Sequence, residues 1–227
     1  MKTKMAFTLA EVIIVIGIIG IIAEMTLPTL ISNVEKDQTV TKLKKIYTEM
    51  SQAVKMSEIE NGSLDNWNYN LNAKDFYDTY MKKYLAKNSE IYLSDYGISY
   101  KNLNKSNCNE SWCVDLGSYY LLLNNGQIIV FSNYKGGNYK AFCADINGYK
   151  NPNIVGKDFF CFTIQYPNGV VPYGYKNAFS YSTFGETYDR NMLLNGSYQS
   201  CNKAKNGLWC TALIVNDGWQ IKDDYPW

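Results

Sequence analysis

MKTKMAFTLAEVIIVIGIIGIIAEMTLPTLISN, residues 1–33, decides the fold of this chain. Lys2 and Lys4 precede an apolar run that no polar side chain interrupts from Val12 to Ala23. A helix over Phe7–Leu27 is about 30 Å long, which matches the hydrocarbon core of a bilayer. The sequence therefore predicts one membrane-spanning helix, and the lysines before it favour a cytoplasmic N-terminus.

Two carboxylates fall within this span. Glu24 lies near its outer end and can reach the interface, whereas Glu11 lies near the inner boundary of the apolar run. A charged side chain at the centre of a bilayer costs about 2.5–3.5 kcal/mol, so an acid in this position indicates a functional site with a partner. The position alone leaves a second interpretation open, in which Glu11 merely extends to the inner interface.

The segment A-F-T-L-A-E, residues 6–11, follows a short basic leader and precedes the apolar run. It resembles the type III signal of type IV prepilins and type II secretion pseudopilins. The resemblance implies that prepilin peptidase cleaves between Ala6 and Phe7 and that Phe7 is then N-methylated. It also implies that Glu11 pairs with the N-terminal amine of a neighbouring subunit. Prepilins usually have Gly before the cut, where this chain has Ala6.

Pro28 lies where pilins commonly carry a proline that kinks the helix. Proline removes one helix hydrogen bond, so a bend or local melting is expected there. Alternatively, Pro28 simply ends the membrane helix. A competing interpretation of the whole N-terminus is an ordinary secretory signal peptide cut near Ala23. Such a signal needs no T-L-x-E pattern before its apolar core.

A second helical pattern follows the membrane segment and defines a predicted stalk over residues 28–61. Apolar residues recur at spacings of three and four between Thr29 and Glu60, and Asn61-Gly62 is a C-terminal stop signal. The apolar spacing is not a strict heptad, so packing on the chain's own head is favoured over a coiled-coil dimer. The predicted parts are a leader (1–6), a polymerisation helix (7–27), this stalk and an exported head (62–227).

The head reads mainly as β-structure. Asn124-Asn125-Gly126 between two apolar runs is typical of a β-hairpin. We expect one short helix, Ala73–Ala86, with an apolar side. The predicted strands are Tyr119–Leu123, Gln127–Phe131, Tyr139–Ala144 and Phe159–Tyr166, followed by a closing hairpin of Thr211–Val215 and Trp219–Ile221. The predicted fold class is α+β, with one long helix packed on an antiparallel sheet, as the pilin resemblance also implies.

All six cysteines lie in the predicted head: Cys108, Cys113, Cys143, Cys161, Cys201 and Cys210. An even number with no CxxC motif favours disulfides over a thiolate metal site, and therefore an oxidising compartment. Six cysteines allow many connectivities. We predict Cys108–Cys113 and Cys201–Cys210, which close short loops, and Cys143–Cys161, which joins two predicted strands.

Residues 145–158 offer oxygen ligands from Asp145, Asn147, Asn153 and Asp158. Calcium favours such ligands, and some pseudopilins bind it in loops. The spacing is not that of an EF-hand, because no glutamate stands at its twelfth position. The alternative is a turn-rich connection, since Asn, Asp, Gly and Pro all favour turns.

Composition narrows the function classes. The chain has 227 residues, a formal net charge of +1 and no histidine. Ser-His-Asp and Cys-His catalysis is therefore excluded, and the charge gives no support to nucleic-acid binding. We expect a structural subunit of a pilus or pseudopilus, not an enzyme. Its expected partners are prepilin peptidase, other pilin or pseudopilin subunits and the inner-membrane assembly machinery. An alternative is an exported adhesin or minor tip pilin that binds a surface or a glycan through Trp- and Tyr-bearing loops.

Overall fold

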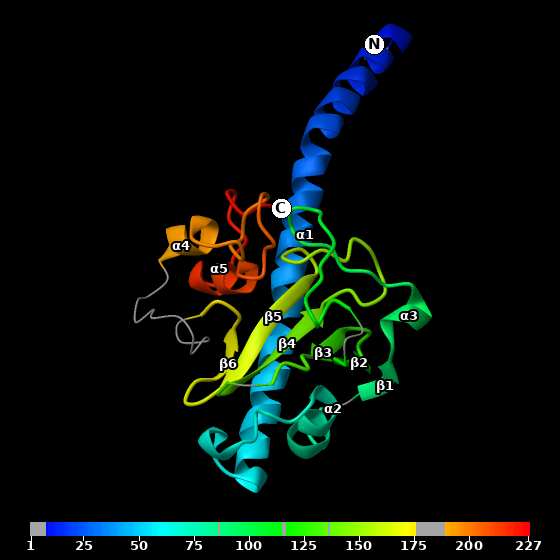
Figure 1. Ribbon diagram of the computed structural model, residues 1–227. Helices are drawn as coiled ribbons and strands as arrows, with labels where there is room; N and C mark the ends of the chain where they lie inside the picture. Colours follow the sequence, from blue (N-terminus) through cyan, green and yellow to red (C-terminus); the bar gives the residue numbers. More distant parts are fainter. Residues whose placement is uncertain (1–7, 86, 115–116, 136, 176–188) are drawn as a thin grey trace. The chain divides into compact units, whose positions relative to one another are not determined.

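The computed structural model describes residues 8–85, 87–114, 117–135, 137–175 and 189–227. Contacts divide the chain into two compact units, Met1–Gln38 and Thr39–Trp227. Helix α1 (Leu9–Asn61) belongs to both units (Figure 1). The remaining helices and all strands belong to the second unit, which contains the hydrophobic core.

The first unit holds the apolar part of α1. Its large apolar side chains are exposed from Leu9 to Val34. Among the described residues, α1 is the one helix that is long and apolar enough to cross a membrane. Pro28 lies inside this helix, which continues to Asn61, so the alternative in which Pro28 ends the membrane helix is wrong. Because proline has no N–H, the carbonyl of Glu24 loses its helical donor, and a kink there stays a prediction.

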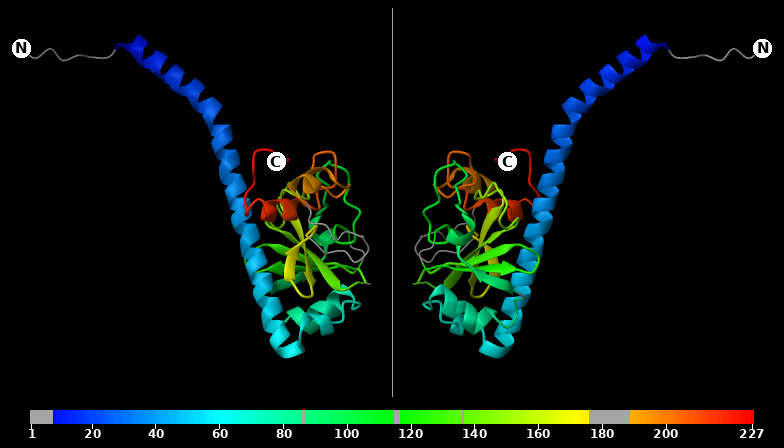
Figure 2. Two further views of the ribbon diagram at one scale, coloured as in Figure 1. Left: turned by 90° about the vertical axis from the view of Figure 1, so that its left-hand side faces the viewer. Right: turned by 90° about the vertical axis from the view of Figure 1, so that its right-hand side faces the viewer.

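In the second unit, α1 is amphipathic. A buried stripe of Leu43, Ile46 and Met50 continues through Ala53 and Val54, at the spacing that places residues on one helix face. The Tyr47 ring lies 6.2 Å from the ring of Phe162 on the sheet, and Figure 2 shows this half of α1 alongside the sheet. The stalk pattern is therefore explained by packing on the chain's own head.

The helix ends where the sequence predicts. Asn61 is the last residue of α1, and Gly62 has a φ of +83°. Gly62 donates its N–H to the carbonyl of Glu58, which satisfies one of the carbonyls left open at a helix end. A residue with a Cβ is strained at that φ, which is why Gly serves as the stop.

The head is built on one six-stranded antiparallel sheet in which each strand pairs with the next along the chain. Its strands are β1 (Lys87–Ile91), β2 (Tyr119–Leu123), β3 (Ile128–Phe131), β4 (Tyr139–Asp145), β5 (Phe159–Gln165) and β6 (Gly169–Pro172). The predicted β2–β3 hairpin is confirmed, with Leu122 opposite Ile128 across the Asn124-Asn125-Gly126 turn. The α+β fold class is confirmed as well.

Short helices surround the sheet (Figures 1 and 2). They are η1 (Leu64–Asn66), α2 (Ala73–Phe76), the π-helix η2 (Tyr77–Met81), α3 (Leu93–Tyr96), α4 (Arg190–Asn195) and α5 (Cys210–Asn216). The helix expected over Ala73–Ala86 is therefore present but ends at Met81. Phe76 and Tyr77 lie 6.2 Å and 5.9 Å from the ring of Phe131, so this helix packs on β3.

The expected closing hairpin is wrong, because residues Cys210–Asn216 form helix α5. The run from Cys210 to Ile214 is buried at every position, and a short apolar run of this kind does not distinguish a strand from a buried helix. Asn216-Asp217-Gly218 terminates the helix instead of turning a hairpin. The N–H groups of Gly218 and Trp219 donate back to the carbonyls of Val215 and Ile214, which is the Schellman pattern.

Candidate functional site

The beginning of helix α1 is organised by two polar side chains. Glu11 Oε2 accepts hydrogen bonds from the backbone N–H of Thr8 at 2.8 Å and from its hydroxyl at 2.9 Å. In return, Thr8 Oγ1 accepts from the N–H of Glu11 at 3.3 Å. This reciprocal arrangement is a capping box, which satisfies N–H groups that have no partner inside the helix.

The capping box gives the T-x-x-E part of the N-terminal motif a local structural role. Sequence reasoning assigned Glu11 only to a partner or to the interface and missed its bond to Thr8. The signal was present, because a threonine followed three residues later by glutamate before an apolar run predicts a helix start. Glu11 therefore fixes the first turn of α1 through its ionisable carboxyl group, which carries a negative charge when deprotonated.

That charge lies in an apolar segment without basic residues. From Thr8 to Val34 the sequence contains Glu11 and Glu24 but neither Lys nor Arg. Any cation that neutralises Glu11 in lipid must therefore come from outside this segment. The predicted cleavage and methylation positions, Ala6 and Phe7, lie outside the described residues, as does the whole predicted leader, 1–6.

The disulfides of the head are the three that the spacing predicts. Sulfur–sulfur bonds join Cys108–Cys113, Cys143–Cys161 and Cys201–Cys210. The second connects directly opposed residues of β4 and β5, with Cα atoms 4.0 Å apart. All six thiols are used, which is the pattern of a domain that folds in an oxidising compartment.

The structure brings the predicted calcium ligands together in the β4–β5 loop. Asp145 Oδ1 accepts from the N–H groups of Asn147 and Gly148 at 3.0 Å and 2.9 Å. Asp158 Oδ2 accepts from the N–H of Asn153 at 2.7 Å and from the side-chain amide of Asn147 at 3.1 Å. The two carboxylates therefore hold the loop in shape through these hydrogen bonds.

Calcium binding in this loop stays a prediction. Among the described residues, no three His, Cys, Asp or Glu side chains are grouped for a metal ion. The side-chain oxygens of Asn147 and Asn153 are buried without a hydrogen-bond partner. They are therefore suited as ligands of calcium, which prefers oxygen ligands. The oxygens of Asp145 and Asp158, by contrast, are already engaged by N–H and O–H donors.

At the end of β4, the carboxyl of Asp145 is a weaker acid than an ordinary aspartate. Asp145 is fully buried, and its Oδ2 accepts from the Tyr100 hydroxyl at 3.0 Å. Burial and the neighbouring Asp158 raise the pKa of Asp145 to about 8, against the effect of its hydrogen bonds. Burial also raises the pKa of Asp158. Both carboxyls accept hydrogen bonds from N–H groups of the β4–β5 loop and so help to fix its conformation.

These observations define the class of protein: an α+β protein with an N-terminal helix able to span a membrane and a head that contains three disulfides. The chain belongs to a family of unknown function (DUF6613), whose model matches residues 29–227. The match covers the head and begins after Pro28, so Thr8 and Glu11 lie outside it. No curated protein and no solved structure matches the chain.

Proposed function

We propose that this chain is a structural subunit of a type IV pilus-like filament or of a type II secretion pseudopilus. It is made as a prepilin, cleaved after Ala6 by prepilin peptidase and N-methylated at Phe7. It resides in the bacterial inner membrane with its N-terminus in the cytoplasm and its head outside. Assembly machinery in that membrane then transfers it into a filament of identical or related subunits. Its role is structural rather than catalytic.

The observation that carries this proposal is the isolated charge of Glu11. The apolar segment contains no cation, and a lone carboxylate in hydrocarbon is costly. Cleavage after Ala6 would create an amine at Phe7, four residues before Glu11. In a staggered bundle, that amine on one copy can lie beside Glu11 on the next, so that two costly charges neutralise each other. The pair would also set the axial register between copies, as buried polar residues do in coiled coils.

The structure sharpens the experiment, because Glu11 has two separable roles. Glu11→Gln retains a side chain that completes a capping box but removes the charge. Thr8→Ala removes the hydroxyl of the cap but retains the charge. We expect the Glu11→Gln chain to be cleaved and inserted in the membrane, while assembly falls by about tenfold or more. Thr8→Ala is expected to weaken the helix start, a cost of about 1 kcal/mol, and to reduce assembly less.

Assembly is measured in cells in two ways. Filaments are sheared from the surface and quantified, and neighbouring copies are joined by a chemical cross-linker that does not react with cysteine. Glu24→Gln is the matched control, because it removes an equal charge near the outer end of the same apolar segment. Normal assembly of Glu11→Gln, or an equal loss in Glu24→Gln, would contradict a specific charge pair at Glu11.

A further inference from the structure

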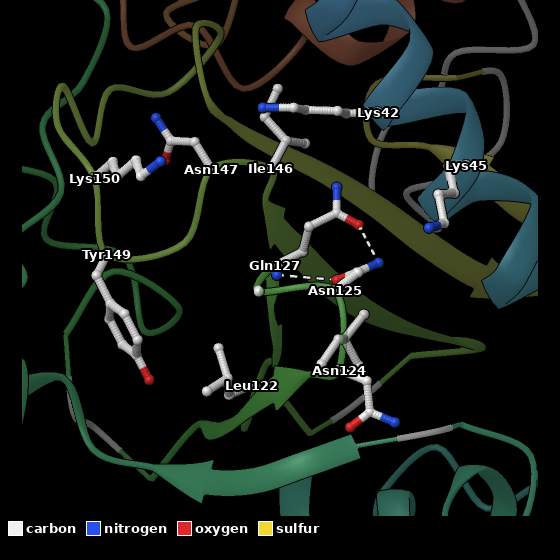
Figure 3. A pocket seen from close by; sticks show the side chains of 12 residues that line it. Lys42, Lys45, Leu122, Asn124, Asn125, Gln127, Ile146, Asn147, Tyr149 and Lys150 are labelled. Atoms are coloured by element: carbon white, nitrogen blue, oxygen red, sulfur yellow. Dashed lines mark hydrogen bonds between the residues drawn. The ribbon is translucent and has the colours of Figure 1, made fainter.

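A groove on the head is lined by residues from three separate segments. Its volume is about 510 Å³, within the range of small-ligand sites. Lys42 and Lys45 come from α1, Asn125 and Gln127 from the β2–β3 turn, and Tyr149 and Lys150 from the β4–β5 loop. All of these residues belong to the second compact unit. We call this site, whose twelve lining residues include these six, the lysine groove (Figure 3).

The charged side chains that line the lysine groove are all positive. Three lysines line it and no Asp or Glu does, whereas the whole chain has a formal net charge of only +1. Figure 3 shows Lys42 and Lys150 on opposite sides of the groove. Lys45 has an acidic neighbour, Glu49, at 3.8 Å, and both side chains are exposed, so this pair is weak. The groove is therefore suited to an anionic ligand.

The two loops that line the groove are held close together. Gly148 approaches so closely that a Cβ there would lie 2.2 Å from the carbonyl oxygen of Gly126. Its N–H is bound by the buried carboxyl of Asp145. In the facing turn, the Asn125 amide donates to Gln127 Oε1 at 2.7 Å, and Asn125 Oδ1 accepts from the N–H of Gln127 at 3.0 Å. The two loops that line the groove are therefore largely preorganised for a ligand.

The remaining lining chemistry favours a sugar. Gln127 is only 5% exposed and its side-chain oxygen is bound by Asn125, so the exposed amide of Asn125 is the group of this pair that can meet a sugar hydroxyl. The Tyr149 side chain is 40% exposed and offers an aromatic body with a polar end. Lysines can form charge-assisted hydrogen bonds with carboxylates, which are stronger than neutral ones. Together these groups match a glycan that carries both hydroxyls and carboxylates.

The same features count against a nucleic acid. The Tyr149 ring is stacked on Tyr96, with centroids 4.2 Å apart and an interplanar angle of 17°, so one of its faces is already covered. The other face suits a sugar ring and a base alike, so the ring does not distinguish the two ligands. Binding of single strands also requires a basic path along the backbone. Three lysines around one groove, on a chain of net charge +1, do not form such a path.

We infer that the lysine groove binds a carboxylated glycan. Lys42, Lys45 and Lys150 contact the carboxylates, the exposed Asn125 amide of the β2–β3 turn contacts a hydroxyl group, and Tyr149 packs against a sugar ring. This binding does not depend on filament assembly, because the groove lies within one copy of the head. It would give the subunit an adhesive role in addition to the structural one.

The test uses the full chain in nanodiscs of zwitterionic lipid, so that the membrane contributes no net charge. Oligosaccharides of galacturonate, glucuronate and mannuronate are titrated beside their uncharged methyl esters. At least one acid form is expected to bind more tightly than its ester, and higher salt should weaken that binding. Binding should also protect Lys42, Lys45 and Lys150 from acetylation, which reports the position of the ligand.

The variant combines Lys42→Gln, Lys45→Gln and Lys150→Gln, and its affinity for the acid is expected to fall by at least about tenfold. The matched control combines Lys55→Gln, Lys101→Gln and Lys203→Gln, which removes the same charge at exposed sites outside the groove. Thermal unfolding of both chains verifies that each is folded.

Three outcomes would overturn the inference. Acid and ester could bind equally in all three pairs, or the control chain could lose as much affinity as the groove variant. A single-stranded oligonucleotide of matched charge could also displace the glycan at a lower concentration, which would assign the groove to nucleic acid. Retained affinity in the control together with selective loss in the groove variant supports the inference.

Discussion

At the scale of single residues, the buried carboxyl of Asp145 makes stability depend on pH. Its pKa is about 8 in the folded chain, whereas the ordinary value is 3.8. Between these two pH values the unfolded chain has released this proton and the folded chain still holds it. Stability must therefore fall as pH rises through this window, because the folded state binds more protons.

Asp145→Asn should reduce this pH dependence. Asparagine can accept from the N–H groups of Asn147 and Gly148 and has no proton to lose. We expect the variant to lose less stability than the parent between pH 5 and pH 8, as measured by urea unfolding followed through tryptophan fluorescence. Asp95→Asn, at an exposed position of α3, is the control and should leave the slope unchanged. An unchanged slope in Asp145→Asn would show that Asp145 titrates normally.

Residue roles were only partly predictable from the sequence. The six cysteines were paired correctly because two pairs are close along the chain and the third joins strands that the pattern identified. The roles of Thr8 and Asp145 were missed. The capping box of Thr8 and Glu11 had a signal in the T-x-x-E spacing that was not used. The partners of Asp145 in the loop are backbone N–H groups, which are present at every position and leave no mark in side-chain patterns.

At the scale of elements, one side chain connects α4, α5 and the C-terminal segment. Arg190, the only arginine of the chain, donates from Nε to Asp217 at 2.7 Å and from its terminal nitrogens to Asp224 at 2.6 Å and 2.5 Å. The Asp217 side chain is only 3% exposed and is also bound by Lys222 at 2.7 Å. A planar guanidinium can serve both acids at once, whereas an ammonium cannot match this geometry.

Arg190→Lys is therefore expected to lower stability by about 1–2 kcal/mol, since hydrogen bonds to charged groups are lost while Lys222 still pairs with Asp217. Thermal unfolding measures the change. Lys83→Gln is the control: Lys83 pairs with Glu60, and both side chains are largely exposed, so its loss should cost less than about 0.5 kcal/mol. Equal effects of the two substitutions would rule out a special role for the Arg190 cluster.

Prediction of elements succeeded where one face of a long element is buried and failed where the pattern is short or polar. Helix α1 shows its 3.6-residue period over its stalk, and β2–β3 has a strong turn signal. Strand β1, Lys-Asn-Ser-Glu-Ile, lies at a sheet edge and has no apolar alternation, so it was not predicted. Helix α5 was taken for a strand because burial on all sides removes periodicity.

At the scale of the whole molecule, the chain has one segment suited to lipid and one suited to water. The exposed apolar half of α1 is suited to lipid, and the disulfide-closed head is suited to an oxidising aqueous compartment. This division was predictable from the sequence, because it depends on long compositional runs and on the positions of cysteines. The family match adds no functional assignment, so the proposed processing requires a direct measurement.

Intact-mass analysis of the purified native protein provides that measurement. In the proposed processing, Lys2 and Lys4 orient the helix before cleavage, and cleavage would replace their charges by one amine beside the apolar segment. We therefore expect a mature chain that begins at an N-methylated Phe7 and in which alkylation without reduction labels no cysteine. Ala6→Lys places a long charged side chain at the cut and should leave the leader attached. A native chain that begins at Glu24 would assign the apolar run to an ordinary signal peptide. One that begins at Met1 would leave Glu11 without the amine on which the proposed assembly depends.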